Sequence, residues 1–150
     1  MTRSQRIAPV QQVLDNTEST HAKQVSAAQA AVVAAEAKLA ELQRYHVEYV
    51  QSFGRQVASG ATCHALQDFQ AFLFRLSEAA KQQEHVVART REELAVQTHH
   101  WQVAARRSRG LQSVVSGWRR EEQMQLERRD QQQTDERALT MMRRAEREAL

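Results

Sequence analysis

The side chains able to do chemistry are few and far apart in this sequence. The single cysteine, Cys63, lies beside His64 near a predicted turn. A cysteine nucleophile needs a pocket and a third group to orient its base, and a chain predicted to form two bare helices offers neither. His99 and His100 are adjacent, so on a helix they point about 100° apart and do not bind one metal ion together. We therefore expect no enzyme, no cofactor and no metal site.

The composition favours a long helical chain over a compact globular one. The 150 residues are 41% hydrophobic but only 5% aromatic, with four Gly and one Pro. Gln, Arg, Glu and Ala dominate and are good helix formers, whereas so few turn residues do not fit a sandwich, a barrel or an α/β enzyme. One cysteine forms no internal disulfide and fits a reducing compartment. With no apolar run of roughly 18 residues and no secretory signal in MTRSQRIAPV, we expect a cytoplasmic protein.

Residues that weaken helices gather in one place, between Gly54 and Cys63. Pro9 suits a first helical turn, where its missing N–H costs nothing. We expect a single coiled-coil domain over residues 1–150 with the following elements: a first helix at about 8–57, a hinge at about 58–63 and a second helix at about 64–148. Whether residues 121–150 are ordered stays open.

Apolar residues recur at alternating steps of three and four in both predicted helices. The first series is Val25, Ala28, Val32, Ala35, Leu39, Leu42, His46, Tyr49 and Phe53. The second runs from Leu66, Phe69, Leu73 and Leu76 through Ala80, Gln83, Val87, Thr90, Leu94, Gln97, Trp101, Ala104, Ser108, Leu111 and Val115 to Trp118. A repeat of about 3.5 residues is the signature of a left-handed coiled coil. The predicted fold class is all-α, a long two-helix antiparallel coiled coil, or α-hairpin.

The register of the two helices follows from the short hinge, which makes them antiparallel. Matching the apolar seams puts Phe53 opposite Phe69 and Leu14 opposite Ser108, and centres the turn at about Ala61. We expect the hinge end, rich in Phe, Tyr and Leu, to be the well-packed end. Polar seam residues farther along usually fix register at a cost in stability.

The second helix is predicted to overhang the first. If the first helix begins near residue 8, it runs out opposite about residue 114. Val115 and Trp118 would then continue the apolar stripe with nothing in the same chain to cover them. The next seam positions are polar or charged and end the stripe.

Arginines give the second helix a basic belt. Residues 86–120 hold seven Arg against Glu92 and Glu93, a local charge of +5, and residues 121–150 hold six Arg against eight acidic side chains. Two interpretations stay open, a belt that docks on an acidic partner and an ordinary solvated outer face. No zipper-plus-basic-region order and no RNP motif is present, so we expect no nucleic acid partner.

Two stretches of this sequence resemble the FliJ family, soluble components of the flagellar type III export apparatus. They are LQRYHVEY at residues 42–49 and, after the hinge, FQAFLFRL at residues 69–76. Trp101, Trp118 and the end rich in Arg, Glu and Gln are also similar to that family. The resemblance covers nearly the whole chain in length and layout.

The resemblance implies a two-helix stalk similar to the coiled coil of the rotary ATPase γ subunit. In the family this stalk inserts into the central hole of the hexameric export ATPase, FliI, and touches the cytoplasmic domain of the export gate, FlhA. It also implies contact with the chaperones of late export substrates, with FliH, FlgN and FliT as further partners. The implied location is cytoplasmic, peripheral to the inner membrane at the flagellar base, and we expect a monomer when the chain is alone.

The resemblance also carries a gate-binding site onto the chain: Leu42, Tyr45, Tyr49, Phe72, Leu76 and Ala79. Lys38 and Gln83 depart from the family pattern, in which Gln and His would stand. The predicted register independently places Tyr45 near Phe72 and Ala79 on one exposed flank, and exposed rigid aromatics favour binding hot spots. The alternative is that these residues only widen the apolar seam.

We expect a second site where the basic belt meets the uncovered apolar residues. This predicted ATPase-ring site comprises Arg106, Arg107, Arg109, Leu111, Val115, Trp118, Arg119 and Arg120. The alternative is self-association through Trp118. Two rival functions also stay open: the equivalent stalk of a virulence type III secretion injectisome, and a generic homodimeric coiled-coil scaffold.

Overall fold

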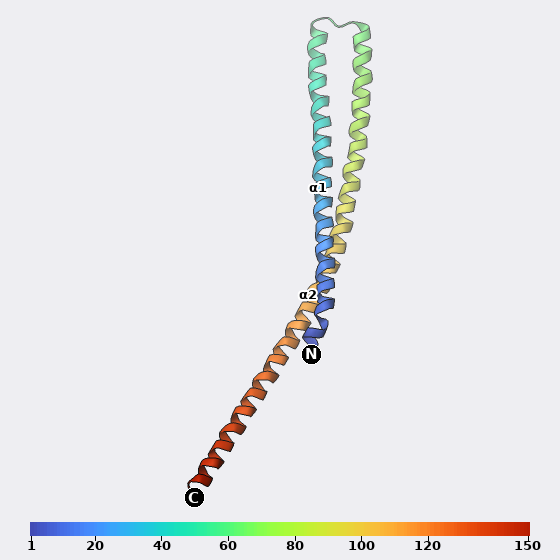
Figure 1. Ribbon diagram of the computed structural model, residues 1–150. Coiled ribbons are helices and arrows are strands. Elements are labelled where there is room, and N and C mark those ends of the chain that lie inside the picture. The colour runs from blue at the N-terminus through green and yellow to red at the C-terminus, as the bar shows by residue number, and fades with distance from the viewer. The chain divides into compact units, whose positions relative to one another are not determined.

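The protein consists of two helices joined by a short turn. The computed structural model describes residues 1–150, with α1 at Arg3–Ala58, α2 at Cys63–Glu148 and no strand. The two helices pack against each other as a hairpin (Figure 1). The predicted all-α, two-helix antiparallel coiled coil is confirmed.

Contacts divide the chain into two compact units, where the sequence suggested one domain over residues 1–150. Unit 1 comprises Met1–Thr17 and Ala104–Leu150, and unit 2 comprises Glu18–Val103. Each unit contains a stretch of both helices, and unit 2 contains the turn that joins them.

The start of α1 differs from the expected start near residue 8. The Thr2 hydroxyl accepts a hydrogen bond from the Gln5 N–H at 3.4 Å, and the Gln5 side-chain oxygen accepts one from the Thr2 N–H at 3.0 Å. This reciprocal pair is a capping box, which satisfies free N–H groups at a helix start. The helix therefore begins at Arg3, and Pro9 lies inside it rather than in its first turn.

The turn between the helices comprises residues 59–62, within the range predicted for the hinge. Gly60 has a φ of 92°, in the left-handed region that a side chain disfavours. Thr62 then caps α2, because its hydroxyl accepts the Ala65 N–H at 3.2 Å. Glycine ends one helix and threonine starts the next.

The predicted seam positions are the buried ones in unit 2. The Phe53 ring stacks on Phe69 with centroids 3.6 Å apart, as the predicted register requires. The Trp101 indole N–H donates to a Glu18 carboxylate oxygen at 2.8 Å, so the pairing extends along the unit. The buried seam residues of unit 2 are Ala28, Ala35, Leu76, Gln83 and Val87.

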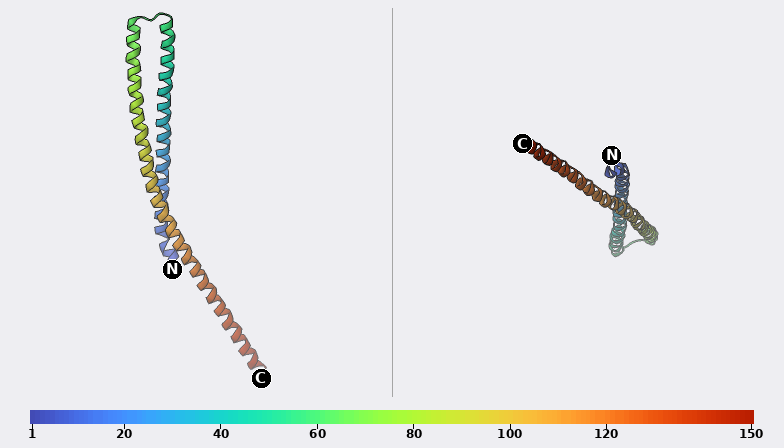
Figure 2. Two further views of the ribbon diagram at one scale, coloured as in Figure 1. Left: turned by 180° about the vertical axis from the view of Figure 1, so that it is seen from behind. Right: turned by 90° about the horizontal axis from the view of Figure 1, so that it is seen from below.

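The hinge end of unit 2 is aromatic, but it is not the best-packed part, and that expectation was wrong. Leu66, Tyr49 and Phe72 are 36%, 39% and 40% exposed. The Tyr49 ring lies 4.2 Å from the Phe72 ring, centroid to centroid. Figures 1 and 2 show the ribbons of α1 and α2 farthest apart near the turn. Large rings fill the space between the backbones, and their outer faces reach water.

Gln83 places a buried hydrogen bond in the seam. Its side chain is 7% exposed, and its amide N–H donates to the carbonyl oxygen of Ala35 at 2.9 Å. Beside this contact, the Arg91 guanidinium pairs with Glu36 at 2.7 Å. A slipped register would leave the buried amide unpaired, which costs free energy. Gln83 therefore fixes the alignment of the two helices.

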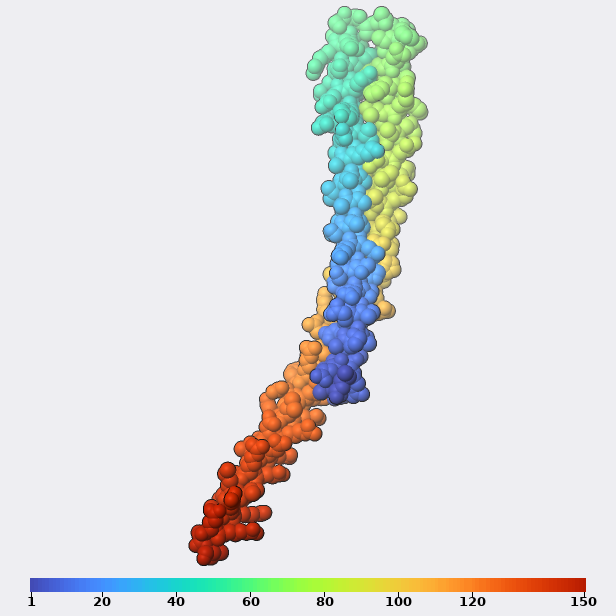
Figure 3. Space-filling model, in the orientation of Figure 1, coloured from blue at the N-terminus to red at the C-terminus, as the bar shows by residue number.

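In unit 1 the first turns of α1 lie along α2. The Ser108 hydroxyl donates to the Asp15 carboxylate, and the Ser4 hydroxyl donates to Glu122, both at 2.6 Å. Beyond Glu122, every residue of α2 is exposed. Figure 3 shows this end of the helix, coloured orange to red, as a single column of side chains.

Replacing Gln83 with alanine should lower the free energy of unfolding by about 1–2 kcal/mol, because a buried hydrogen bond is lost and a small cavity is left. Thermal and urea unfolding followed by circular dichroism would measure this. Gln82→Ala is the matched control, since Gln82 is exposed on the same turn and its loss should cost less than about 0.5 kcal/mol. Equal effects of the two substitutions would contradict a register role for Gln83.

Candidate functional site

The groups considered for catalysis or metal binding form no site. Cys63 is exposed, and the neighbouring His64 ring lies 3.6 Å from the Asp68 carboxylate on the next turn of the same helix. His21 and His100 stack across the helices with centroids 6.0 Å apart. No group of three or more His, Cys, Asp or Glu residues is placed to hold a metal ion. Neither helix is long and apolar enough to cross a membrane.

Four exposed aromatic side chains lie near the turn in unit 2: Tyr45, Tyr49, Phe72 and Phe74. We call the first three the hinge patch. Tyr45 is 45% exposed. Its hydroxyl donates to the Glu41 carboxylate at 3.0 Å, and the Arg44 guanidinium carbon lies 5.6 Å from its ring centroid. These neighbours hold the ring at the surface rather than in the seam.

The other three predicted gate-binding residues lie deeper than the hinge patch. Leu76 is buried, and Leu42 and Ala79 are half-buried. The sequence reasoning left out Phe69, which stacks on Tyr49 at 5.2 Å and braces the hinge patch. Phe69 could have been predicted from its place in the apolar seam series, next to the residues of the patch.

Val115 and Trp118 are not bare, and the expectation that nothing covers them is corrected. Along α2, Val115 lies between Ser108 and Glu122, both bonded to α1, and it is 1% exposed. Trp118 is half-buried, with the Arg3 guanidinium carbon 5.2 Å from its ring centroid. The earlier helix start accounts for the cover on Trp118, because Arg3 lies in the stretch that it adds to α1.

The arginines of unit 1 remain available to a partner. From here on, the basic belt means only those five arginines of residues 86–120 that lie in unit 1: Arg106, Arg107, Arg109, Arg119 and Arg120. All five are exposed, and none forms a hydrogen bond or an ion pair. Leu111 beside them is half-buried. Free guanidinium groups on a fixed helix suit a carboxylate-bearing surface.

Ser4 and Glu122 are joined by two hydrogen bonds between the helices in unit 1. Ser4 is 7% exposed, and both its hydroxyl and its backbone N–H donate to the Glu122 carboxylate, at 2.6 and 3.1 Å. The Ser4 hydroxyl bond is the main cause that lowers the pKa of Glu122, with help from the Ser4 N–H, Thr2 and the Arg3 charge, against a smaller opposing effect of burial. The carboxylate therefore stays ionised and holds the start of α1.

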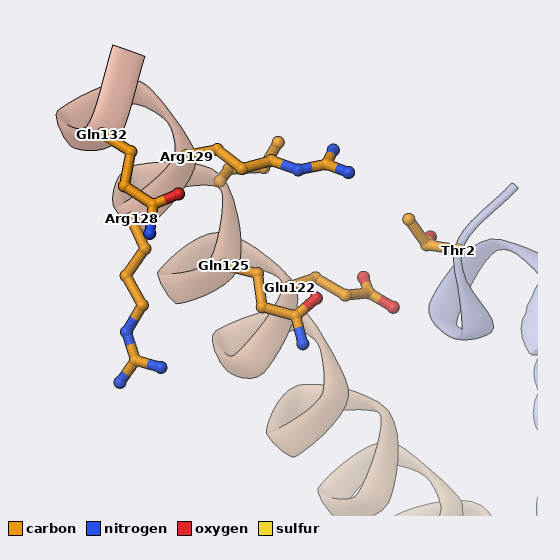
Figure 4. A pocket seen from close by; sticks show the side chains of 7 residues that line it. Thr2, Glu122, Gln125, Arg128, Arg129 and Gln132 are labelled. Carbon is orange, nitrogen blue, oxygen red and sulfur yellow. The ribbon is translucent and has the colours of Figure 1, made fainter. Parts of the chain in front are cut away.

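A shallow groove of about 360 Å³ lies where α1 begins along α2. In Figure 4 the Arg129 and Glu122 side chains extend toward Thr2, whereas Arg128 points away. Only one large apolar residue, Leu126, lines the groove. This lining confirms that the apolar stripe ends here, as the sequence indicated.

One comparison with known proteins decides the family. The family model described as "Flagellar FliJ protein" matches residues 3–147, nearly the full chain. This chain belongs to the FliJ family. No curated protein and no solved structure matches it. FliJ proteins are non-catalytic components of flagellar protein export, and the matched range includes both helices and the turn.

Membership in the FliJ family places the two surfaces of the chain in a flagellar context. The matching model is a flagellar one, which favours flagellar export over the virulence injectisome. On this FliJ-family chain, the hinge patch lies at the stretches that carried the resemblance. The basic belt lies in unit 1 and contains no residue of those stretches.

Acid should release the start of α1 in this FliJ protein. A lowered carboxyl pKa contributes stability that is present above the ordinary value of 4.5 and is lost as the pH falls through the lowered pKa. In a ¹H–¹⁵N titration, the Ser4 amide should therefore shift with an apparent pKa below 4.5. Glu122→Gln should abolish this transition, while Asp130→Asn should keep it. A Ser4 shift that survives in Glu122→Gln would contradict the assignment.

Proposed function

We propose that this chain is the stalk and adaptor of the flagellar export apparatus, linking the hexameric ATPase FliI to the cytoplasmic domain of the gate FlhA. The observation that carries the proposal is the FliJ family match over residues 3–147. Two separate surfaces support it, the hinge patch in unit 2 and the basic belt in unit 1. FliH and the chaperones FlgN and FliT are further proposed partners, at the cytoplasmic face of the inner membrane.

The hinge patch is the proposed gate-binding surface. Its rings are large and rigid, and between 39% and 45% of each residue is exposed. Tyr49 packs on Phe69 and Phe72, so the rings keep their positions without a partner. Little conformational entropy would then be lost on binding, which is the usual advantage of aromatic hot spots. Leu42, Leu76 and Ala79 contribute by supporting the patch.

The basic belt is the proposed ATPase-binding surface. Its five guanidinium groups are unpaired in the chain, so a partner carboxylate would not have to displace an existing ion pair. Exposed charges of one sign speed association with an oppositely charged surface, and this effect weakens with salt. Val115 contributes no contact area while it is covered by α1.

The proposed mechanism involves no chemistry by the chain itself. A single hairpin lacks the rotational symmetry of a six-membered ring, so it touches the ring subunits unequally. Unequal contacts bind some subunit conformations better than others, and such differential affinity is what shifts a conformational equilibrium. The chain would thus stabilise and bias the ring while its hinge patch engages the gate.

Replacing both Tyr45 and Phe72 with alanine should weaken binding to the FlhA cytoplasmic domain by at least about tenfold, because two hot-spot rings are lost. Isothermal titration calorimetry with the purified partners would measure the affinity. Circular dichroism should show unchanged helix content, since both side chains lie outside the buried seam.

Val47→Ala with Phe74→Ala is the matched control for the gate experiment. These residues are 54% and 67% exposed, and they lie outside the hinge patch. The control pair should bind the gate with unchanged affinity. If the folded wild-type chain did not bind the FlhA cytoplasmic domain, this result would refute the proposal that the hinge patch binds the gate. The family assignment would stand.

Arg119→Gln with Arg120→Gln should weaken binding to the FliI hexamer by roughly threefold to tenfold at low salt, because two surface charge contacts are lost. The difference from wild type should shrink as salt is added. Arg143→Gln with Arg144→Gln is the control, since it removes the same charge outside the basic belt. Equal loss in both variants would indicate a general charge effect. If light scattering showed that the free chain is a dimer, this result would instead favour the homodimeric scaffold.

A further inference from the structure

A pocket of about 220 Å³ adjoins the hinge patch on the side toward the turn. Tyr49 belongs both to the patch and to the pocket wall, so the pocket continues the surface that we propose to bind the gate. Both helices contribute to its lining, which comprises Tyr49, Ser52, Phe53, Gln56, Ala65, Asp68 and Phe69.

The apolar wall of the pocket is a stack of three rings. The Phe69 ring lies between Phe53 and Tyr49, with centroid distances of 3.6 and 5.2 Å and planes within 7° and 5° of parallel. Phe53 and Phe69 are half-buried between the helices. The wall is therefore formed before any partner binds, and a side chain that packs on it does not have to order it.

The other side of the pocket is polar and carries one negative charge. Ser52 and Gln56 provide side-chain oxygens that can accept hydrogen bonds, and Asp68 is the only charged residue of the lining. The Asp68 side chain is 73% exposed. Its one ion-pair partner in the chain is the His64 ring at 3.6 Å, which pairs with it only when the ring is protonated. When His64 is neutral, the carboxylate is free for a partner.

An apolar wall beside a free carboxylate fits one class of side chain. Arginine and lysine carry a charged head on an apolar stem, and the stem packs along apolar surface while the head stays at the rim. Guanidinium and ammonium groups also donate several hydrogen bonds, which suits a pocket rich in acceptors. An acidic side chain would be repelled by Asp68. An aliphatic one would displace water from the acceptors without replacing its hydrogen bonds.

We propose that this pocket binds a basic side chain of the gate's cytoplasmic domain, with the stem on the rings of Phe53 and Phe69 and the charged head at Asp68. The inference rests on the proposed gate-binding function of the hinge patch and adds the class of residue that the partner presents. The hinge patch supplies apolar contact, and the charge at Asp68 selects a partner surface of the opposite sign.

Substitutions at Asp68 test the pocket in the complex with the FlhA cytoplasmic domain. At about pH 8, where a histidine ring is ordinarily neutral, Asp68→Asn should weaken binding by about threefold to fivefold at low salt, because one ion pair is lost. Its affinity should also depend less on salt than that of the wild type. Asp68→Glu keeps the carboxylate and should restore most of the affinity. Isothermal titration calorimetry would measure all three chains, with circular dichroism to confirm equal helix content.

Glu84→Gln is the matched control for Asp68→Asn. Glu84 is an exposed carboxylate of unit 2 that lines a separate groove with Val47 and Lys81. Its removal changes the net charge equally and should leave gate binding unchanged. An equal loss in the two variants would mean that only the overall charge matters and would overturn the proposal. Equal gate binding by the wild type and Asp68→Asn would overturn it as well.

A second measurement tests the pocket without the gate domain. Nα-acetyl-arginine amide, added to the full-length chain, should shift the ¹H–¹⁵N signals of Gln56, Ala65 and Phe69. It should bind at least about threefold more tightly than Nα-acetyl-citrulline amide, a neutral compound of nearly the same shape, because only arginine can form the ion pair. This preference should disappear in Asp68→Asn.

The two measurements separate failure of the pocket from failure of the proposed function. If the gate domain binds the wild-type chain, the comparison of Asp68→Asn with its control decides. If the folded wild-type chain binds no gate domain, the proposed function fails and the titrations with the two amides decide alone. A preference for arginine that depends on Asp68 would then support a site for basic side chains, and equal binding of arginine and citrulline would rule it out.

Discussion

Two packed helices can hide only one stripe of each other from water, and this narrow seam determines the rest of the structure. Seven apolar residues are buried, and four of them are alanines: Ala28, Ala35, Ala104 and Ala105. So little apolar area does not by itself select one alignment. Polar contacts between the helices, such as Gln83 with Ala35 and Ser4 with Glu122, therefore carry much of the specificity. Most of the remaining side chains of the chain are exposed.

The fold was predictable from the sequence because an apolar repeat of about 3.5 residues maintained over many turns indicates a coiled coil, and the residues of the turn place one reversal of the chain between the two helices. The start of α1 was not predicted correctly. The capping box at Thr2 and Gln5 is a local hydrogen-bond pattern that outweighed the usual place of proline in a first turn. That shift of boundary placed Arg3 over Trp118, which was expected to be uncovered. Val115, also expected to be uncovered, is the most deeply buried side chain.

The candidate surfaces were predictable only in part. Residue types and the predicted register identified Tyr45 and Phe72 as candidate surface residues. Periodicity, however, assigns a residue to the seam without showing how deeply that residue is buried. Burial depends on how far apart the helix backbones stand, and the stacked rings near the turn keep them apart. The basic belt was visible as a run of charges, whereas its lack of ion pairs depends on where each acidic side chain lies. The match over residues 3–147 shows the family, and the roles of the two surfaces are proposals that go beyond it.

The contacts between the helices also differ in how much chain separates their partners. Gln83 and Ala35 are 48 positions apart, whereas Ser4 and Glu122 are 118 apart. Closing a long loop costs more entropy than closing a short one, so pairing is favoured to begin at the turn and to spread away from it. During synthesis the residues around Ser4 leave the ribosome before their partners on α2, which are made more than a hundred residues later. The earliest part of this chain is therefore the last to acquire its native neighbours, and until then it must remain soluble without them.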